Sequence, residues 1–452
     1  MNRLQLFPVV LLLIVGLVAT AAAERRGTTS ASEVAVVDFT SQMSVGGQGN
    51  AATSYLSQYP VFLPYVHSLS QGYRPPSMVR VSVDSAGQQA NGNSYGSDMT
   101  PDGRFVVFQS DATNLVPGDS NGVRDVFIHD RHTGQTTRVS IGANGTQGNG
   151  PSSGGKISAD GRYVAYVSTA TSLVAGDSNA FQDVFVHDRQ TGETTLISLG
   201  HDGTPSNGDS GWPDISADGR YVVFESAANN LDPSDTDTQN DVFLYDRQLP
   251  QAILISTMLE DTSIGGETPS ISADGRFTAF AYDNGIYLYD HSLAKLYLAY
   301  QGSGGYYAGR NPEISGDGNF IVYETVTYDD IPWPPGPVNH YTLNRYDRQT
   351  GTSEYFSNSI QPFFGSSPNP TVSFNGRFTA FGDGLIFVLD FHTEEVVVVS
   401  TNLNGENPDG VAMAQAISAD GRVIMMESVA TDLVANDTNG VQDVFMRDRG
   451  SP

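Results

Sequence analysis

The chain has 452 residues, and 39% of them have apolar side chains, which is enough for a substantial core. Only 16% are charged, glycine numbers 48 and cysteine is absent; this composition is typical of turn-rich β-structure and excludes disulfides, thiolate metal sites and cysteine nucleophiles. Acidic residues outnumber basic ones by 50 to 23, so the formal net charge is -27, which argues against a nucleic-acid partner.

The first 23 residues predict a secretory signal peptide. Arg3 precedes an apolar run over residues 6–19, and three alanines at 21–23 supply a small-residue cleavage site. The run is short for a bilayer span, so cleavage is favoured over a retained anchor, and no membrane span is expected after it. Residues 24–78 form a lead rich in Ser, Gly and Tyr, either flexible or packed. We therefore expect an exported protein, whether periplasmic, cell-surface or secreted.

A short motif recurs seven times from residue 98 onward. It has the form Ser-Ala-Asp-Gly-Arg or a close variant, and spacings of 43 to 58 residues are those of propeller blades or solenoids. Its glycines are Gly103, Gly161, Gly219, Gly275, Gly318, Gly376 and Gly421. Each copy predicts a tight hairpin in which both central residues have φ above zero.

Each repeat predicts four short strands. The segment after every turn is continuously apolar, as at 105–108 and 163–166, which a strand buried on both faces requires. Two further strands follow, for example at 125–130 and 136–140. Four antiparallel strands per repeat are the blade of a β-propeller.

The two ends of the array predict a closed ring. The seventh copy stops at residue 449 without a fourth strand, whereas an unpaired strand at 79–83 precedes the first copy. If the early strand completes the last blade, no exposed sheet edge remains. We therefore predict an all-β fold, a seven-bladed β-propeller of four-stranded antiparallel blades over residues 79–449, closed by an N-terminal strand.

Four of the seven repeats contain an acidic loop between their second and third strands. Its first Asp stands 16 residues after the hairpin glycine, an Asn or Asp follows two residues later, and a last Asp stands six residues after the first. Oxygens at this spacing can converge on Ca²⁺, as at the start of an EF-hand loop, although the later EF-hand ligands are missing. The alternative is a set of Asx-turns in which the last Asp anchors a strand. The candidate metal ligands are Asp119, Asn121, Asp125, Asp177, Asn179, Asp183, Asp235, Asp237, Asp241, Asp437, Asn439 and Asp443.

Two strings resemble the nucleophile motifs of serine hydrolases, around Ser94 and Ser210. Ser94, Ser152 and Ser210 lie 58 residues apart in equivalent loops, which indicates repeat architecture rather than one nucleophile. No catalytic residue is assigned. Residues that interrupt the repeat are better candidates for ligand contacts, and the alternative is that they form a packed loop cap. They are the insertion at 328–340 with Trp333, the residues Tyr306, Tyr307 and Arg310 before the turn of the fifth blade, and Trp212 in a loop ahead of the third blade.

The repeats resemble the TolB-like β-propeller repeats of exported bacterial proteins, whose signature is a Ser-Pro-Asp-Gly-type turn, an apolar strand and an Ile-Tyr-Val-x-Asp-type strand. The resemblance implies the architecture, but not an activity, because such propellers have many functions. We expect no counterpart of the α/β domain of TolB in residues 24–78, so a Tol-Pal role is not implied.

The expected function is that of a non-catalytic binding or scaffold module for a protein or glycan ligand, with Ca²⁺ in the blade loops. The alternative is a polysaccharide lyase or hydrolase with a site at the channel mouth. Such an enzyme requires a His, an Arg and two acids from several blades to converge there.

Overall fold

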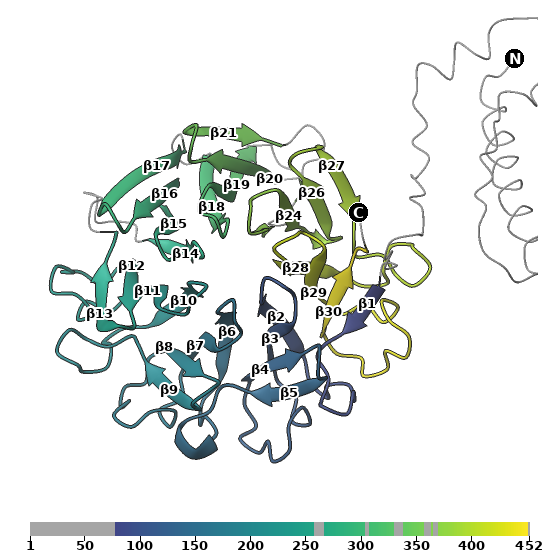
Figure 1. The fold of residues 1–452 in the computed structure, drawn as a ribbon, viewed down its shortest axis with the longest axis horizontal. Coiled ribbons are helices and arrows are strands. Elements are labelled where there is room, and N and C mark those ends of the chain that lie inside the picture. Colours follow the sequence, from purple (N-terminus) through teal and green to yellow (C-terminus); the bar gives the residue numbers. More distant parts are fainter. Residues whose placement is uncertain are drawn as a thin grey trace, which may run out of the picture. The chain divides into compact units, whose positions relative to one another are not determined.

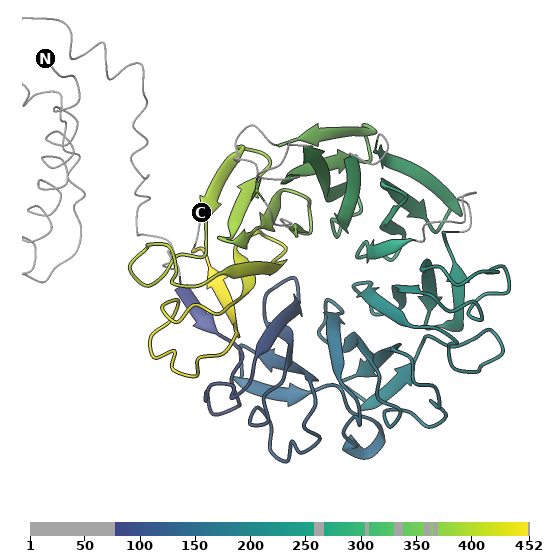
Figure 2. The same cartoon turned by 180° about the vertical axis from the view of Figure 1, so that it is seen from behind.

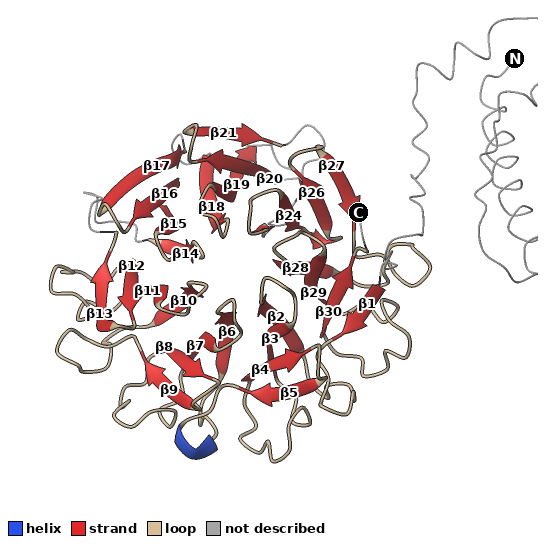
Figure 3. Cartoon of the chain, in the orientation of Figure 1, coloured by secondary structure: helices blue, strands red, loops and turns tan. Residues whose placement is uncertain are grey.

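A computed structural model describes residues 77–256, 266–302, 307–329, 338–356, 363–364 and 369–450. Within these ranges the chain forms seven antiparallel sheets arranged in a ring (Figures 1 and 3). The predicted seven-bladed propeller is therefore confirmed. The predicted signal peptide and nearly all of the lead lie outside the described residues, among which no helix is long and apolar enough to cross a membrane.

The first three blades repeat one strand order, from an inner first strand to an outer fourth strand. Blade 1 consists of β2 (Ser94–Met99), β3 (Phe105–Ser110), β4 (Asp125–Asp130) and β5 (Gln135–Arg138). Blade 2 consists of β6 (Ser152–Ile157), β7 (Tyr163–Ser168), β8 (Asp183–Asp188) and β9 (Glu193–Leu196), after a short 3₁₀ turn, η2 (Ala143–Gly145). Blade 3 consists of β10 (Ser210–Ile215), β11 (Tyr221–Ser226), β12 (Asp241–Asp246) and β13 (Leu249–Leu254).

The next three blades are less regular. Blade 4 consists of β14 (Glu267–Ile271), β15 (Phe277–Tyr282), β16 (Gly285–Asp290) and β17 (Lys295–Gln301). Blade 5 consists of β18 (Tyr307–Ile314), β19 (Phe320–Asp329), β20 (Val338–Asp347) and β21 (Thr352–Tyr355), and β22 (Phe363–Phe364) also pairs with β20. Blade 6 consists of β23 (Thr371–Val372), β24 (Phe378–Phe381), β26 (Phe387–Asp390) and β27 (Glu395–Val398).

Blade 7 closes the ring with strands from both ends of the propeller. It consists of β28 (Ala412–Ile417), β29 (Val423–Ser428), β30 (Asp443–Asp448) and β1 (Ser77–Arg80), with β25 (Asp383–Gly384) on the free edge of β28. β1 pairs antiparallel with β30 (Figure 2). In this register Arg80 lies opposite Phe445. Oγ of Ser82 then donates a 2.6 Å hydrogen bond to Oδ1 of Asp443. The predicted closure is confirmed, and the closing strand begins two residues earlier than expected.

The core lies within and between the blades because their second and third strands are buried on both faces. In blade 1, Phe108 and Phe127 stack with ring centroids 5.7 Å apart. Phe224 and Phe243 repeat this pair in blade 3 at 5.8 Å. Phe108 and Phe127 belong to one buried cluster with Met425 and Val444 of blade 7, so the continuous apolar runs of the sequence also form the core between blades.

The hairpin turns differ from the expected geometry. Only their glycine has a positive φ, between +68° and +73° in the seven copies, and the Asp or Asn before it does not. In blade 1 the N–H of Gly103 donates to the carbonyl of Thr100 at 2.7 Å, which closes a type I-like turn followed by one left-handed residue. The prediction of two positive φ values was wrong, because a four-residue turn can be closed with a single glycine.

Candidate functional site

Seven equivalent residues, one per blade, stand five positions before the hairpin glycines on the innermost strands. They are Asp98, Lys156, Asp214, Ser270, Glu313, Thr371 and Ala416. A cavity of about 560 Å³, which we call the channel cavity, is lined by residues from the inner side of all seven blades. Four of these equivalent residues (156, 270, 313 and 371) line it directly. Ring closure therefore brings together a cation and acidic groups that are far apart in the sequence.

Lys156 lies among acidic groups at this cavity. Its Nζ is 3.7 Å from Oε1 of Glu313, whose Oε2 accepts a 2.8 Å hydrogen bond from Ser270. Burial alone would lower the pKa of Lys156, but the charges of Glu313, Asp214 and Asp98 raise it well above its ordinary value. Burial raises the pKa of Asp98 and brings that of Asp214 to about 7. Lys156 therefore stays cationic, which makes it unsuitable as a general base.

Some of these acids also fasten neighbouring blades together. Oδ2 of Asp98 accepts the N–H of Ile157 in the next blade at 3.0 Å. Oδ2 of Asp214 accepts the N–H of Ile271 in the next blade at 2.8 Å. Part of the polarity of the channel is thus structural, since it satisfies backbone groups that the inner-strand bulges leave unpaired.

Trp212 lies where the channel cavity meets a second one. This second cavity, of about 620 Å³, we call the side cavity; it is lined by residues of blades 3 to 6, among them Arg310, Glu267 and Tyr341. The Trp212 side chain is 65% exposed and borders both cavities. The expectation that Trp212 stands in a loop was wrong, because it belongs to the bulged inner strand β10. Trp212 and Arg310, both marked by the sequence as departures from the repeat, therefore line one cavity.

Five residues that stand seven positions before a hairpin glycine lie in the left-handed region, four of them at bulges of the inner strands. Gly154 has φ +65°, Trp212 +46°, Thr268 +50°, Asn311 +47° and Asn369 +41°. Glycine adopts this conformation freely, whereas a bulky or β-branched residue there costs about 1–3 kcal/mol. All five line the channel cavity, and all but Gly154 also line the side cavity. Backbone strain is therefore concentrated where the two cavities meet.

The acid–base set required by the enzyme alternative is only partly present. Of the described residues that line the two cavities, none is a histidine. His129 and His187 are buried in β4 and β8, where each hydrogen-bonds a threonine of the neighbouring strand at 2.9 Å. The channel instead offers Lys156 with its acids, and Arg310 at the side cavity.

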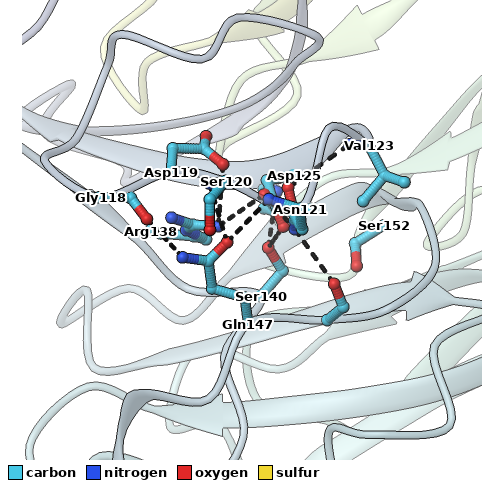
Figure 4. Close-up of polar contacts among 12 residues, drawn as sticks. Gly118, Asp119, Ser120, Asn121, Val123, Asp125, Arg138, Ser140, Gln147 and Ser152 are labelled. Atoms are coloured by element: carbon cyan, nitrogen blue, oxygen red, sulfur yellow. Dashed lines mark hydrogen bonds and ion pairs between the residues drawn. The ribbon is translucent and has the colours of Figure 1, made fainter.

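In blades 1 and 7 an arginine of the outermost strand lies between the carboxylates of the acidic loop. In blade 1, Nη1 of Arg138 lies 2.8 Å from Oδ2 of Asp125 and 3.3 Å from Oδ1 of Asp119 (Figure 4). Asn121 donates to the same Asp125 oxygen at 2.9 Å, and Ser140 donates to the other at 2.6 Å. The candidate ligands Asp119, Asn121 and Asp125 do come together, around a guanidinium.

Blade 7 repeats this arrangement with an arginine from the closing strand. Nη2 of Arg80 is 2.8 Å from Oδ2 of Asp437, and its Nε is 3.3 Å from Oδ2 of Asp443. Asn439 donates to Asp443 at 2.8 Å. The three candidate ligands of this blade also meet, and the cation that joins them comes from the other end of the propeller.

Blades 2 and 3 have the acidic loop without the arginine. In blade 2, burial raises the pKa of Asp177 to about 6, with a further contribution from the charge of Asp183. Asn179 lies in the same loop and donates to the carbonyl of Ser206 at 3.0 Å. In blade 3, carboxylate oxygens of the three candidate ligands Asp235, Asp237 and Asp241 all lie within 4.8 Å of one another, so an acidic cluster with the composition of a metal site is present.

The hydrolase-like serines have a structural role. Ser94, Ser152 and Ser210 are buried, and each shares a hydrogen bond of 2.8–2.9 Å with a serine at the end of the second strand of its own blade. These hydrogen bonds link the first two strands of each blade, and the buried serines are inaccessible to a substrate. Trp333 and most of the insertion around it lie outside the described residues.

No protein-family model matches the sequence, and no curated protein sequence matches it. Solved structures with a similar fold do match the chain. Oligogalacturonate lyase from Vibrio parahaemolyticus is 14% identical over 84% of this chain and 98% of its own, with a TM-score of 0.51. An oligogalacturonate lyase in complex with manganese is 13% identical over 83% and 97%, with a TM-score of 0.53.

At these identities the likeness shows the fold alone. A putative TolB from Agrobacterium tumefaciens is 13% identical over 58% of this chain and 80% of its own, and its TM-score of 0.38 is too low to extend the comparison. The protein is a seven-bladed β-propeller whose blades have the four-stranded pattern predicted from the sequence.

Proposed function

We propose that this protein is an exported, non-catalytic propeller that binds a neutral glycan around Trp212, where the channel and side cavities meet. The observation that supports this most directly is the conformation of Trp212: a large aromatic side chain is 65% exposed on a strand whose backbone is strained at the same residue. Folding gains little from exposing an indole, and strained residues cluster at functional sites. An aromatic face beside two cavities is suited to packing against a ligand.

The polar lining supports a hydroxyl-rich ligand. Gln109, Gln182, Asn311, Asn369 and Gln415 all contribute to the channel cavity. An amide side chain offers donors and an acceptor together, as a sugar hydroxyl does. Some of these groups already bind the protein, as Oε1 of Gln109 and Nε2 of Gln182 do, and the remaining ones can pair with hydroxyls without a net charge.

The charge of the site favours a neutral glycan over an acidic one. Carboxylates of Glu313 and Glu267 line the two cavities, the single lysine among the residues described there is surrounded by acids, and the whole chain has a net charge of -27. An oligogalacturonate would have to approach against this potential.

The second candidate is the lyase alternative, which the shared fold of the two oligogalacturonate lyases keeps open. A lyase acting on an acidic polymer needs cations to bind the uronate and a base to remove a proton. Arg310 could supply the first, whereas the cationic Lys156 is poorly suited to the second. Incubation with polygalacturonate, followed by ultraviolet absorbance of unsaturated products, distinguishes the two functions.

The test is a Trp212→Gly variant titrated with neutral and acidic oligosaccharides by calorimetry. We expect wild type to bind a neutral oligosaccharide, and the variant to lose at least tenfold in affinity. Its melting temperature should be unchanged or higher, because glycine relieves the strain at φ +46°. Leu249→Ala is the matched control, since Leu249 is 70% exposed on the outer strand β13 and borders neither cavity. Undiminished affinity in the Trp212 variant would overturn the proposal.

Export and Ca²⁺ are part of the same proposal but do not depend on the ligand. Export rests on the signal peptide predicted over residues 1–23. Ca²⁺ is proposed for an acidic loop that lacks the arginine, because in blades 1 and 7 a guanidinium already lies between the carboxylates. Extracellular Ca²⁺ modules bind this ion with weak affinity, so a weak site suffices outside the cell.

A further inference from the structure

The four blades that have the acidic loop differ at one position of their outermost strand. In blades 1 and 7 this position is Arg138 and Arg80, and in blades 2 and 3 it is Leu196 and Leu254. The strand registers show that the positions are equivalent, because each residue pairs with the phenylalanine at the third position of the neighbouring strand. Two blades of the same chain therefore have the acidic loop with an arginine beside it, and two have the loop with a leucine in that place.

Blade 2 lacks that cation although its acids are as buried as those of blade 1. Asp183 is fully buried and Asp177 is only 9% exposed. Ser198 and Ser206 donate to Oδ1 of Asp183 at 2.6 and 2.8 Å. The other oxygen of this carboxylate, Oδ2 of Asp183, is buried, and so is Oδ1 of Asp177. Neither oxygen accepts a hydrogen bond from the described residues. The corresponding oxygens in blade 1 are the two that contact Arg138.

Two buried carboxylates are strongly unfavourable unless they take up a proton or a cation, and a cation between them would stabilise this loop as Arg138 does in blade 1. The ligands are carboxylate oxygens, which suit a hard ion, and an irregular loop fits the flexible coordination geometry of Ca²⁺ better than the near-ideal octahedron that Mg²⁺ demands. Asn179 is better placed to shape the turn, because its Oδ1 accepts the N–H of Phe181 at 3.0 Å while its amide nitrogen binds Ser206.

We propose that Ca²⁺ takes, in blade 2, the place that the arginine guanidinium takes in blades 1 and 7, with Oδ1 of Asp177 and Oδ2 of Asp183 as its protein ligands. The ion then fastens the loop before β8 to the blade, as Arg138 fastens the loop before β4. This assignment does not rest on glycan binding. The acidic cluster of blade 3 has no buried carboxylate oxygen without a partner among the described residues, so we do not extend the assignment to it.

The first experiment compares melting temperatures of the full chain in EDTA and in millimolar Ca²⁺. For wild type we expect Ca²⁺ to raise the melting temperature by a few degrees, and Mg²⁺ to do so much less. No difference between EDTA and Ca²⁺ would overturn the proposal.

The second experiment exchanges the two kinds of cation. Leu196→Arg should melt in EDTA at about the temperature of wild type in Ca²⁺, and should no longer respond to Ca²⁺. Arg138→Leu in blade 1 should show the opposite behaviour, with a larger response to Ca²⁺ than wild type. Leu196→Met is the matched control, because it preserves volume without charge and should keep the wild-type response.

Two further variants test the assignment if Leu196→Arg fails to fold or if the ion is bound in another blade. If Leu196→Arg does not fold, Asp177→Asn serves in its place and should lose the response to Ca²⁺. If Leu254→Arg abolishes the response while Leu196→Arg keeps it, the ion is bound in blade 3 and the assignment to blade 2 is wrong.

Discussion

At the scale of single residues, two equivalent side chains make the same inter-blade contact with different charge. Oε2 of Glu427 in blade 7 accepts the N–H of Gly96 at 2.9 Å, and Oε1 of Gln109 in blade 1 accepts the N–H of Gly154 at 2.9 Å. Burial raises the pKa of Glu427 from 4.5 to about 7. The folded protein therefore binds more protons than the unfolded chain between these two values, so this glutamate stabilises the fold at low pH and the benefit is lost as the pH rises towards 7.

We predict that Glu427→Gln raises stability at pH 8 by roughly 1–3 kcal/mol and leaves it nearly unchanged at pH 4. The glutamine can keep the hydrogen bond to Gly96, as Gln109 does with Gly154, without an ionisable group. Denaturant unfolding at the two pH values measures the effect. The reverse variant, Gln109→Glu, should lose stability at pH 8 only, and a loss for Glu427→Gln at pH 8 would contradict the explanation.

The candidate site shows which residues the sequence could indicate. Trp212 stands out as one of two tryptophans, and Arg310 as a departure from the repeat. The meeting of Lys156 with Asp98, Asp214 and Glu313 was missed, although all four stand five positions before a hairpin glycine. Their offset was visible, but their proximity depends on ring closure and on bulges that no local pattern indicates.

At the scale of elements, each hairpin from the second blade on packs against the blade before it. A Cβ atom on Gly161 would lie 2.4 Å from the ring of Phe105, and one on Gly219 would lie 2.2 Å from that of Tyr163. The hairpin glycine is therefore needed twice, once for its positive φ and once because its neighbour's aromatic ring occupies the space of a side chain. The sequence indicated only the first reason.

We predict that Gly161→Ala destabilises the protein by roughly 2–4 kcal/mol. The matched control is Gly192→Ala, because Gly192 has nearly the same φ, +75° against +73°, but no atom within 4 Å of the added carbon. The control should cost about 1 kcal/mol from backbone strain alone. Thermal and denaturant unfolding of both variants separate the two contributions, and equal losses would show that the contact with Phe105 is unimportant.

At the scale of the whole molecule, β1 contributes more than a strand to blade 7. Arg80 supplies the cation between Asp437 and Asp443, and Ser82 binds the other oxygen of Asp443. Without this segment, β30 would be an open edge and two buried carboxylates would lose their partners.

We predict that a chain of residues 87–452 is less stable than one of residues 69–452 by at least about 3 kcal/mol and self-associates. Size-exclusion chromatography and thermal melts of the two chains test this. A monomeric short chain with an unchanged melting temperature would show that closure by β1 is dispensable.

The number of blades and the mode of closure could be predicted because the hairpin motif recurs in every blade and the missing strand of the last blade has a visible counterpart before the first. Two short strands, β22 and β25, could not be predicted. β22 and β25 pair with β20 and β28 outside the repeat pattern, and nothing in their few residues distinguishes them from loop.

Closure by β1 has a consequence for the order of biosynthesis. Ser82 and Asp443 are separated by 361 positions, so the ribosome releases the first strand of the propeller long before its partner exists. Blades 1 to 6 are each contiguous in the chain and can assemble as they emerge, whereas the seventh must wait for β30. Pairing of β1 with β30 is therefore the last strand pairing of the ring to become possible, and until then β1 has to remain without its partner.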